Sequence, residues 1–324
     1  MEAIASSRIE GTQASLSELF YFEAATESPK PSVDVLEVNN YRKALDYGIN
    51  RLNELPLSLR LIREIHEILM TGVRGGTPDK TPGRFRTSQN WIGGYGFNLD
   101  AATFVPPPPD RLMEVLGDWE IFLNQRNTEL PLLIQCAMMH YQFETIHPFL
   151  DGNGRVGRLL ISLFLHERKA LPYPLLYLSS YFERHQDEYY DRLLAVSQKG
   201  QWEQWIAFFL KGVVTQGERA IESARKLVDR REQYRNTLYE MKATAPAIRL
   251  LDMIFTLYIV SNRTVVERLK VSFPTAQKAI EQLIKIGALE PFTGKQRNRF
   301  YIASQLLQSL EETMSMSDPT DDTE

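Results

Sequence analysis

Two stretches of the chain, Leu132–Phe143 and Val156–Phe164, are apolar on nearly every side at helical spacing. A helix without a polar face has to be surrounded by protein, so we expect both stretches at the centre of a helical core. Amphipathic stretches at Leu59–Leu69 and Leu112–Leu123 would cover them, and a long helical segment begins at Trp202 and continues through a charged connecting region. The pattern predicts a mainly α fold.

Composition narrows the class of protein. The chain has 324 residues, of which 43% are hydrophobic and 24% charged, which is typical of a globular protein with two or three domains. The net charge of −4 excludes a chain that coats nucleic acid or binds membranes through basic residues. The single cysteine, Cys136, allows no intrachain disulfide. Because we find neither a secretory signal nor an apolar stretch long enough to span a bilayer, we expect a cytoplasmic protein without a membrane partner.

Two stretches depart from helical spacing. Gly72–Pro109 is rich in glycine and proline, and within it Trp91–Val105 predicts a β-hairpin. Thr244–Ala303 predicts a helix, a short helix, a turn and a third helix, followed by two strands around Gly294, which is the order of a winged helix-turn-helix. The predicted organisation is an N-terminal segment 1–28, a helical core 29–215, a connecting helix 216–243, a winged helix 244–303, and an acidic, disordered tail 304–324.

The segment 147–158, HPFLDGNGRVGR, predicts an anion-binding site. Gly152 and Gly154 let backbone amides approach a ligand closely. The helix that starts near Arg155 would point its free amides and the positive end of its dipole at the same place. Because Arg155 and Arg158 are three residues apart, they can share one face of the first turn and supply two cations. Such a site suits a polyphosphate.

Two further side chains of this segment indicate catalysis. Asp151 offers a hard oxygen ligand for Mg²⁺, which proteins bind through one or two carboxylates and the substrate's phosphates. His147 is the side chain there that can act as a base near neutral pH. A simpler interpretation is a glycine-rich helix N-terminus with surface arginines, but the coincidence of several chemical roles argues against it. The parts together are those needed for transfer of a group from a nucleotide.

Residues 147–158 match every fixed position of the Fic family signature, His-x-Phe-x-Asp/Glu-Gly-Asn-Gly-Arg-x-x-Arg. Most Fic enzymes transfer AMP from ATP to a Ser, Thr or Tyr hydroxyl of a protein. The segment Gly83–Arg86 and the predicted hairpin resemble the family's flap for positioning the target, and a winged helix occurs in one bacterial branch. The resemblance implies a helical Fic core with a β-hairpin flap, in which Ile92, Gly93 and Gly94 would position the target.

The resemblance also implies a role for each matched residue. His147 would take the proton from the target hydroxyl, and Asp151 would hold Mg²⁺. Ser6-x-x-x-Glu10-Gly11 resembles the family's inhibitory helix, in which Glu10 would pair with Arg158 and disturb the γ-phosphate. Some relatives contact the adenine through an asparagine at the position that Ser197 occupies here. The residues implied to bind the nucleotide are Asp151, Gly152, Asn153, Gly154, Arg155, Arg158, Tyr189 and Tyr190.

We therefore expect an autoinhibited protein adenylyltransferase that uses ATP and Mg²⁺. Its substrate would be a hydroxyl side chain of a protein, including the enzyme itself. One alternative is another reaction at the same site, either removal of AMP or transfer of a different phosphate-containing group. The other is a DNA-binding regulator whose Fic core only senses nucleotide. Because a sensor needs no base, His147 argues against the regulator.

The role of the predicted winged helix is open. Thr244–Ala303 contains nine basic and four acidic residues, a net charge of +5. This modest excess is equally consistent with binding DNA and with docking to a protein. Whether the chain forms a homodimer is also open. The basic and polar residues that would face DNA are Lys278, Gln282 and Lys285 on the recognition helix, and Lys295, Arg297 and Arg299 on the wing.

Overall fold

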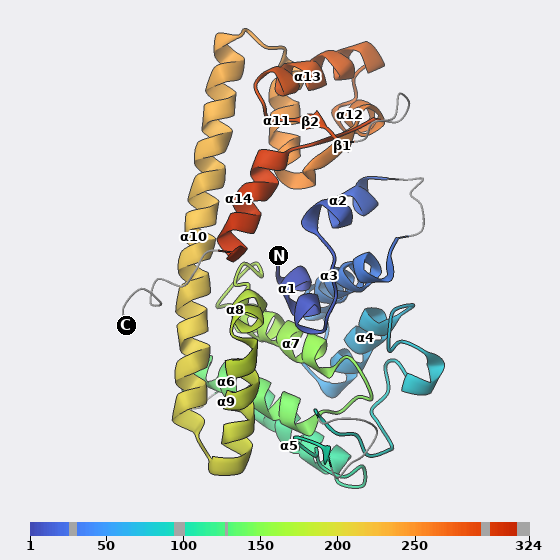
Figure 1. Ribbon diagram of the computed structural model, residues 1–324, viewed down its shortest axis with the longest axis vertical. Helices are drawn as coiled ribbons and strands as arrows, with labels where there is room; N and C mark the ends of the chain where they lie inside the picture. Colours follow the sequence, from blue (N-terminus) through green and yellow to red (C-terminus); the bar gives the residue numbers. More distant parts are fainter. Residues whose placement is uncertain (26–30, 94–100, 127–128, 293–298, 316–324) are drawn as a thin grey trace. The chain divides into compact units, whose positions relative to one another are not determined.

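The computed structural model describes residues 1–25, 31–93, 101–126, 129–292 and 299–315. The described chain is mainly helical with one small sheet, which confirms the predicted fold class (Figure 1). It divides into two compact units. Residues 2–14 and 32–217 form the helical unit, and residues 1, 15–31 and 218–324 form the sheet unit.

The helical unit is built around α6 (Leu132–Ile146) and α7 (Asn153–Glu167), the two stretches predicted to be central. Side chains on several sides of both helices are buried, among them Cys136, Phe143 and Leu160. The surrounding helices are α1 (Glu2–Ile9), α3 (Val33–Arg51), α4 (Leu59–Met70), the 3₁₀ turn η1 (Pro78–Lys80), α5 (Leu112–Asn124), α8 (Leu178–Arg184), α9 (Gln186–Lys199) and the first part of α10 (Trp202–Glu240).

Indole hydrogen bonds fix the packing around α6. Trp119 on α5 donates to the carbonyl of Met139 at 3.0 Å, and Trp205 on α10 donates to the carbonyl of Ala137 at 3.0 Å. Both indoles are buried, so these bonds satisfy polar groups that water cannot reach. They orient α6, whose last turn leads into the segment 147–158.

The sheet unit contains a three-stranded antiparallel sheet in the order β1-β3-β2. Its elements follow the order predicted for a winged helix, with one unforeseen strand, β1, after the first helix; the winged-helix assignment itself stays a prediction. The expected turn at Gly294 and the residues Lys295 and Arg297 lie outside the described residues. The elements are α2 (Leu16–Ala24), the second part of α10, α11 (Ala245–Leu257), β1 (Ile259–Ser261), α12 (Asn262–Leu269), α13 (Phe273–Lys285), β2 (Glu290–Pro291), β3 (Phe300–Ile302) and α14 (Ser304–Ser315).

The two ends of the chain show details that the sequence did not predict. The prediction of a disordered tail from residue 304 is wrong: Ser304–Ser315 forms α14, in which Leu306 packs into the core of the sheet unit and Leu307 is also buried. The sequence predicted 1–28 as the segment that carries the inhibitory helix; within it, α1 belongs to the helical unit and α2 to the sheet unit. Aromatic contacts hold α2 there: Phe20 stacks on Tyr258 with ring centroids 4.8 Å apart.

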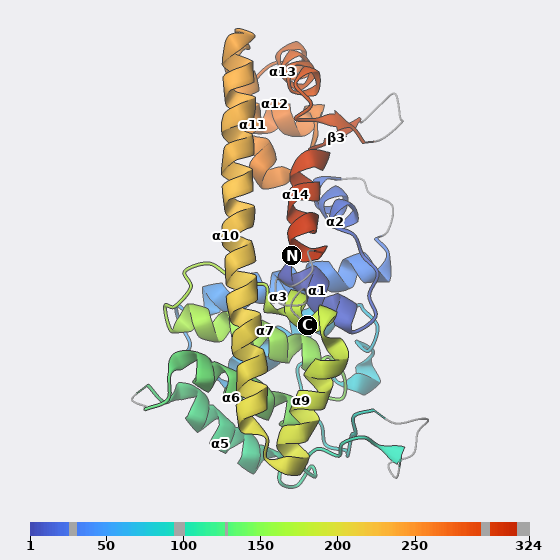
Figure 2. The same cartoon turned by 60° about the vertical axis from the view of Figure 1, so that its left-hand side comes forward.

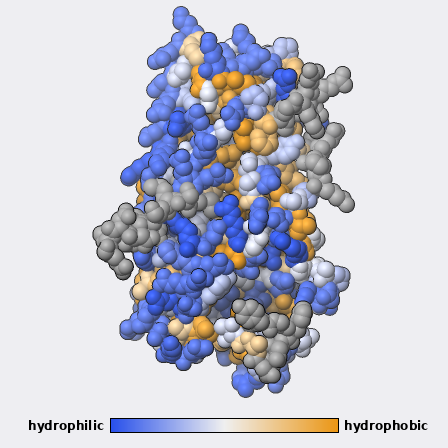
Figure 3. Space-filling view, in the orientation of Figure 1, coloured by the Kyte–Doolittle hydropathy of each residue, from blue (hydrophilic) through white to orange (hydrophobic). Residues whose placement is uncertain are grey.

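The face seen in Figure 3 is largely hydrophilic, with smaller apolar areas between. Among the helices of the described chain, none is both long and apolar enough to cross a membrane. The longest of these helices is α10 (Figures 1 and 2). It has 39 residues, and many of them are charged.

Candidate active site

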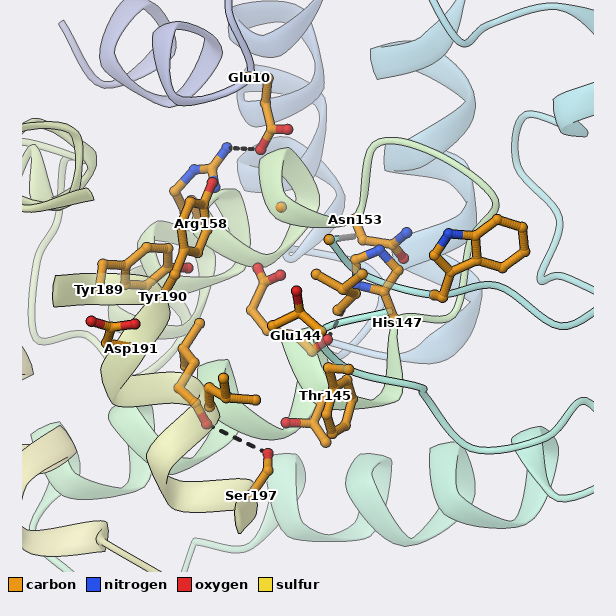
Figure 4. Close-up of a pocket in the computed structure, with 18 of the residues that line it drawn as sticks. Glu10, Glu144, Thr145, His147, Asn153, Arg158, Tyr189, Tyr190, Asp191 and Ser197 are labelled. Carbon is orange, nitrogen blue, oxygen red and sulfur yellow. Dashed lines mark hydrogen bonds and ion pairs between the residues drawn. The ribbon is translucent and has the colours of Figure 1, made fainter. Parts of the chain in front are cut away.

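A pocket of about 580 Å³ lies in the helical unit, where the end of α6 and the start of α7 meet one side of α9 (Figure 4). Its lining includes His147, Asp151 and Arg158 from the segment 147–158. Glu10, from the end of α1, lies at the same pocket. The structure therefore brings together residues that are up to 148 positions apart in the sequence.

Two backbone positions with positive φ shape the loop between α6 and α7. His147 ends α6 with φ of 50°, and Gly152 precedes α7 with φ of 78°. The side chain of Asn153 closes this loop: its Oδ1 accepts from the amide of Phe149 at 2.8 Å, and its Nδ2 donates to the carbonyl of Phe149 at 2.9 Å. The side chain of Asn153 therefore hydrogen-bonds within the loop. The backbone amides of the first turn of α7 have no partner within the helix, so they can bind a ligand.

The environment of His147 keeps its imidazole neutral. Its Nδ1 lies 3.2 Å from the carbonyl of Glu144, which can only accept, so Nδ1 carries the proton and Nε2 has the lone pair. Burial lowers the pKa of His147 to about 4, so the imidazole is neutral at pH 7. The carbonyl of His147 accepts from Arg86 at 2.9 Å and from Asn90 at 3.1 Å. These bonds fix the backbone from which the imidazole projects.

Arg86 is a structural residue that the sequence did not reveal. Its guanidinium is buried and donates to the carbonyls of His147, Ile146 and Pro107, while its amide donates to Pro148. It thereby ties the catalytic loop to the exit of the hairpin. The sequence indicated a role for Arg86 only through the resemblance of Gly83–Arg86 to the family's flap. Burial of an arginine cannot be inferred from a single sequence.

Asp151 fits the expected Mg²⁺ ligand. Its side chain is 41% exposed in the pocket, and its Oδ1 accepts from the amide of Gly152 at 2.6 Å. Within the described residues, no group of three or more metal-ligating side chains occurs. One carboxylate beside a phosphate-binding turn nevertheless suits Mg²⁺, because this ion keeps waters and binds the substrate's phosphates.

The two arginines of the segment differ in their surroundings. Arg155 is buried, lies 3.5 Å from Asp151 and is not among the residues that line the pocket. Arg158 is also buried, and α1 occupies its donors: Nε donates to Ser6 Oγ at 2.9 Å, and Nη2 donates to the carbonyl of Ser6 at 2.8 Å and to Glu10 Oε1 at 2.7 Å. The structure thus brings Ser6 and Glu10 together on Arg158.

The carboxylate of Glu10 lies over the first turn of α7. A Cβ atom on Gly154 would lie 2.5 Å from Glu10 Oε1, so this glycine leaves the space that the carboxylate fills. Burial would raise the pKa of Glu10, but the Arg158 guanidinium outweighs it and lowers that pKa. The pair is therefore ionised at neutral pH.

The helix α1 has its own anchor. The carboxylate of Glu2 is buried and accepts hydrogen bonds from the amide and hydroxyl of Ser179 on α8. Burial raises the pKa of Glu2. Thr12, just after α1, donates to Glu37 at 2.5 Å. Because α1 is held at both ends, Glu10 is kept at Arg158.

The two adjacent tyrosines of α9 lie differently. Tyr190 is 45% exposed and lines the pocket. Tyr189 also lines it but is 1% exposed, and its hydroxyl lies 2.8 Å from Nε2 of His140. Ser197 lines the pocket too, and its hydroxyl lies 2.8 Å from that of Tyr141. The apolar walls and these hydroxyls leave room for a nucleoside beside the phosphate site.

Glu144 is a second residue that the sequence did not reveal. It lines the pocket one turn before His147, and its Oε1 is buried without a hydrogen-bond partner among the described residues. Burial raises the pKa of Glu144 to about 7. Because a carboxyl group with this pKa is partly protonated at neutral pH, it can donate a hydrogen bond into the pocket.

The hairpin forms the remaining wall of the pocket. Ile92 and Phe104 exchange backbone hydrogen bonds of 2.9 and 3.1 Å, so the two segments pair as predicted. Ile92 and Gly93 line the pocket, whereas Gly94 lies outside the described residues. A Cβ on Gly93 would lie 2.4 Å from the hydroxyl of Thr103, which explains the glycine there.

The fold is that of Fic proteins, and one pocket holds the neutral imidazole of His147, the first turn of α7 and the carboxylate of Glu10. Residues 56–165 match the model of the Fic/DOC family, and residues 1–50 match that of the Fic/DOC family N-terminal region. The chain therefore carries a Fic domain with its N-terminal region, as the sequence motif indicated.

Curated relatives agree with this assignment. The chain is 32% identical over 153 residues to protein adenylyltransferase Fic of Aedes aegypti, a match that covers 47% of this chain and 27% of the relative. It is 33% identical over 110 residues to protein adenylyltransferase fic-1 of Caenorhabditis elegans, covering 34% of this chain and 19% of the relative. The chain thus spans about a quarter or less of the length of these relatives.

Solved structures share the fold. A Fic family protein from Desulfovibrio desulfuricans G20 has a TM-score of 0.55 at 21% identity, covering 93% of this chain and 86% of that one. A fragment of Fic-1 from C. elegans has a TM-score of 0.51 at 24% identity, covering 68% of this chain and 62% of that one. The similarity to the first structure extends over both units.

Proposed function

We propose that the protein is an adenylyltransferase that transfers AMP from ATP to a hydroxyl side chain of a protein. The observation that carries the proposal is a neutral imidazole, with its Nε2 lone pair available, in one pocket with the N-terminal turn of α7. The relatives named protein adenylyltransferase support it. Pyrophosphate would be the leaving group.

The residues of this chain account for the steps of the transfer. His147 Nε2 takes the proton of the target hydroxyl as its oxygen forms a bond to the α-phosphorus, while the bond from that phosphorus to the bridging oxygen of pyrophosphate breaks. The amides at the start of α7 hold charge that develops on the phosphates. Asp151 would hold Mg²⁺, which, when bound, neutralises phosphate charge. Arg158 would hold the γ-phosphate once Glu10 has left it.

The hairpin is proposed to align the target. An extended target segment would add along the backbone near Ile92 and Gly93, and such pairing reads backbone more than side chains. The target includes the enzyme itself. We place this reaction in the cytoplasm, where a free, buried thiol such as that of Cys136 stays reduced.

Radioactive ATP separates the proposed reaction from its alternatives. With α-³²P-ATP we expect labelled protein, and with γ-³²P-ATP we expect none. Label from γ-³²P-ATP would instead mean phosphorylation, and loss of label from a previously modified protein would mean removal of AMP. If neither nucleotide labels the protein and it retards DNA, the regulator interpretation replaces the enzyme.

Asp151→Ala should weaken nucleotide binding in the presence of Mg²⁺, and additional Mg²⁺ should restore part of it. The reason is that the variant loses its hard oxygen ligand while the amides of α7 remain. Calorimetric titration with ATP, with and without Mg²⁺, measures the effect. The proposed role is contradicted if the Mg²⁺-dependent part of the affinity does not change.

For the predicted winged helix, we propose protein docking over DNA binding. Of the three residues expected to face DNA from α13, Gln282 instead accepts from the amide and hydroxyl of Thr244 at 3.2 and 2.8 Å. The exposed side of α13 also carries Glu281 between Lys278 and Lys285, and an acid there would repel phosphates.

A salt titration tests this choice. If the unit binds DNA after all, affinity should fall steeply with salt because each phosphate contact releases counterions. Replacing Lys295, Arg297 and Arg299 with alanine should then flatten that dependence. We expect no retention of a mixed-sequence duplex even at low salt, and salt-sensitive retention by the intact protein would favour DNA.

A further inference from the structure

The long helix α10 carries a row of exposed apolar side chains at seven-residue spacing. Val214, Ile221 and Val228 are 59%, 55% and 59% exposed. Seven residues make nearly two helical turns, so the three side chains lie along one line of about 21 Å. Single exposed apolar residues are ordinary, but a heptad row is typical of a seam between two helices. We call these three residues the α10 row.

Small residues alternate with the α10 row. Gly217 and Ala224 each follow a row residue by three positions, so they lie on the same face. A Cβ on Gly217 would meet nothing within 4 Å, and Ala224 is exposed. A second helix can therefore approach closely at these positions, and its own large side chains would fill the space that the small ones leave.

One flank of the row carries charges that alternate in sign. Lys211, Glu218, Arg225 and Glu232 are also seven residues apart, and all four are exposed. Glu232 lies 3.9 Å from Arg231, a long and exposed contact. Flanking charges of this kind set the partner and the orientation of paired helices.

The charge pattern selects an antiparallel copy of the same helix. In an antiparallel pair this flank faces itself, so Glu218 meets Arg225 of the copy and Lys211 meets its Glu232, always with opposite sign. In a parallel pair, the charged flank of one helix would face the opposite flank of the other helix. The residues of that opposite flank, Val213, Ala220 and Leu227, carry no charge and could not pair with it.

The same alignment matches large side chains with small ones. In an antiparallel pair, the row residues of one helix and the small residues of the other form common layers. When Glu218 lies opposite Arg225 of the copy, Ile221 therefore packs on Ala224 of the copy. In the same way, Val228 packs on its Gly217. A two-fold axis passes between positions 221 and 224 of the two helices, so each of these contacts is repeated with the two copies exchanged. In the same register Val214 falls opposite Arg231 of the copy. Size complementarity therefore holds for two of the three row residues, and there it agrees with the spacing and the charge pattern.

We propose that α10 is a self-association surface, on which a second copy of this chain docks through an antiparallel, two-fold pair of α10 helices. The pairing uses the α10 row, Gly217 and Ala224, with four charge pairs along one edge. It involves no residue of the pocket, so its tests do not depend on the proposed enzymatic activity.

Sedimentation of the full chain over a range of concentrations tests the surface. Wild type should dimerise reversibly, and Ile221→Asp should weaken association at least tenfold. Glu218→Arg should also weaken it, because arginines then face each other, while Glu218→Arg combined with Arg225→Glu should restore it. Lys226→Arg, on a different side of α10, is the control and should behave as wild type. A wild type that stays monomeric at all concentrations would overturn the proposal.

Disulfide trapping tests the orientation. Because Cys136 is buried, only the introduced cysteines are accessible to form a disulfide between chains. A mixture of Ile221→Cys and Ala224→Cys chains should form a cross-linked dimer under mild oxidation, and each variant alone should do so poorly. Efficient cross-linking of each variant with itself would mean a parallel pair and overturn the antiparallel arrangement. Recovery of dimer in the charge-swapped variant excludes misfolding as the cause of the losses.

Discussion

His147→Ala is expected to lower the rate of AMP transfer by about 10²- to 10⁴-fold, the usual contribution of a general base. The variant loses the Nε2 lone pair, while the loop keeps its shape because Arg86 and Asn90 bind the carbonyl of residue 147. ATP affinity should therefore stay close to that of wild type. Initial rates of labelling from α-³²P-ATP measure the first effect, and calorimetry measures the second.

The pH dependence gives a second readout for the same residue. Burial lowers the pKa of His147 to about 4, while nearby Glu10 raises it and Arg86 lowers it. The imidazole is thus unprotonated throughout the neutral range, and protonation of His147 should reduce the rate only as the pH falls toward about 4. His185→Ala is a matched control, since His185 is not among the residues that line the pocket. Wild-type labelling by His147→Ala would exclude the base.

The sequence predicted the centre of the site because its parts are contiguous. His147, Asp151 and the glycines lie in one loop and one helix turn, where local geometry alone brings them together. The apolar character of α6 and α7 likewise predicted their central place. Both inferences depend on short-range patterns, which a single sequence displays directly.

Residues that act through distant contacts could not be predicted in this way. Arg86 reaches carbonyls about 60 positions away, and only the fold shows that it is buried. The raised pKa of Glu144 depends on burial, which its position in an amphipathic turn does not reveal. The order in Ser304–Ser315 was missed because the polar side chains of α14 hide the two leucines that are buried.

The inhibitory role of Glu10 was predicted from a resemblance, and its contacts with Arg158 supply a physical reason to expect it. Its carboxylate and the Ser6 carbonyl and hydroxyl together occupy Nε and Nη2 of Arg158. A γ-phosphate would need those donors, and the negative charge of Glu10 would repel it. We therefore expect ATP to bind with its α-phosphate displaced from His147, and a misplacement of this kind can cost about 10²-fold in rate.

Glu10→Gly is therefore expected to raise the rate of self-labelling from α-³²P-ATP at least about tenfold, which corresponds to roughly 1.4 kcal/mol off the barrier. Glu10→Gln is the matched variant, because it keeps the size of the side chain and removes its charge, and it should give part of the gain. Arg158→Ala should be slow, and Glu10→Gly should not rescue it, since the partner of the γ-phosphate is gone. Equal initial rates for wild type and Glu10→Gly would show that Glu10 does not inhibit. A lower rate in Glu10→Gly would point instead to AMP removal, with Glu10 orienting the attacking water.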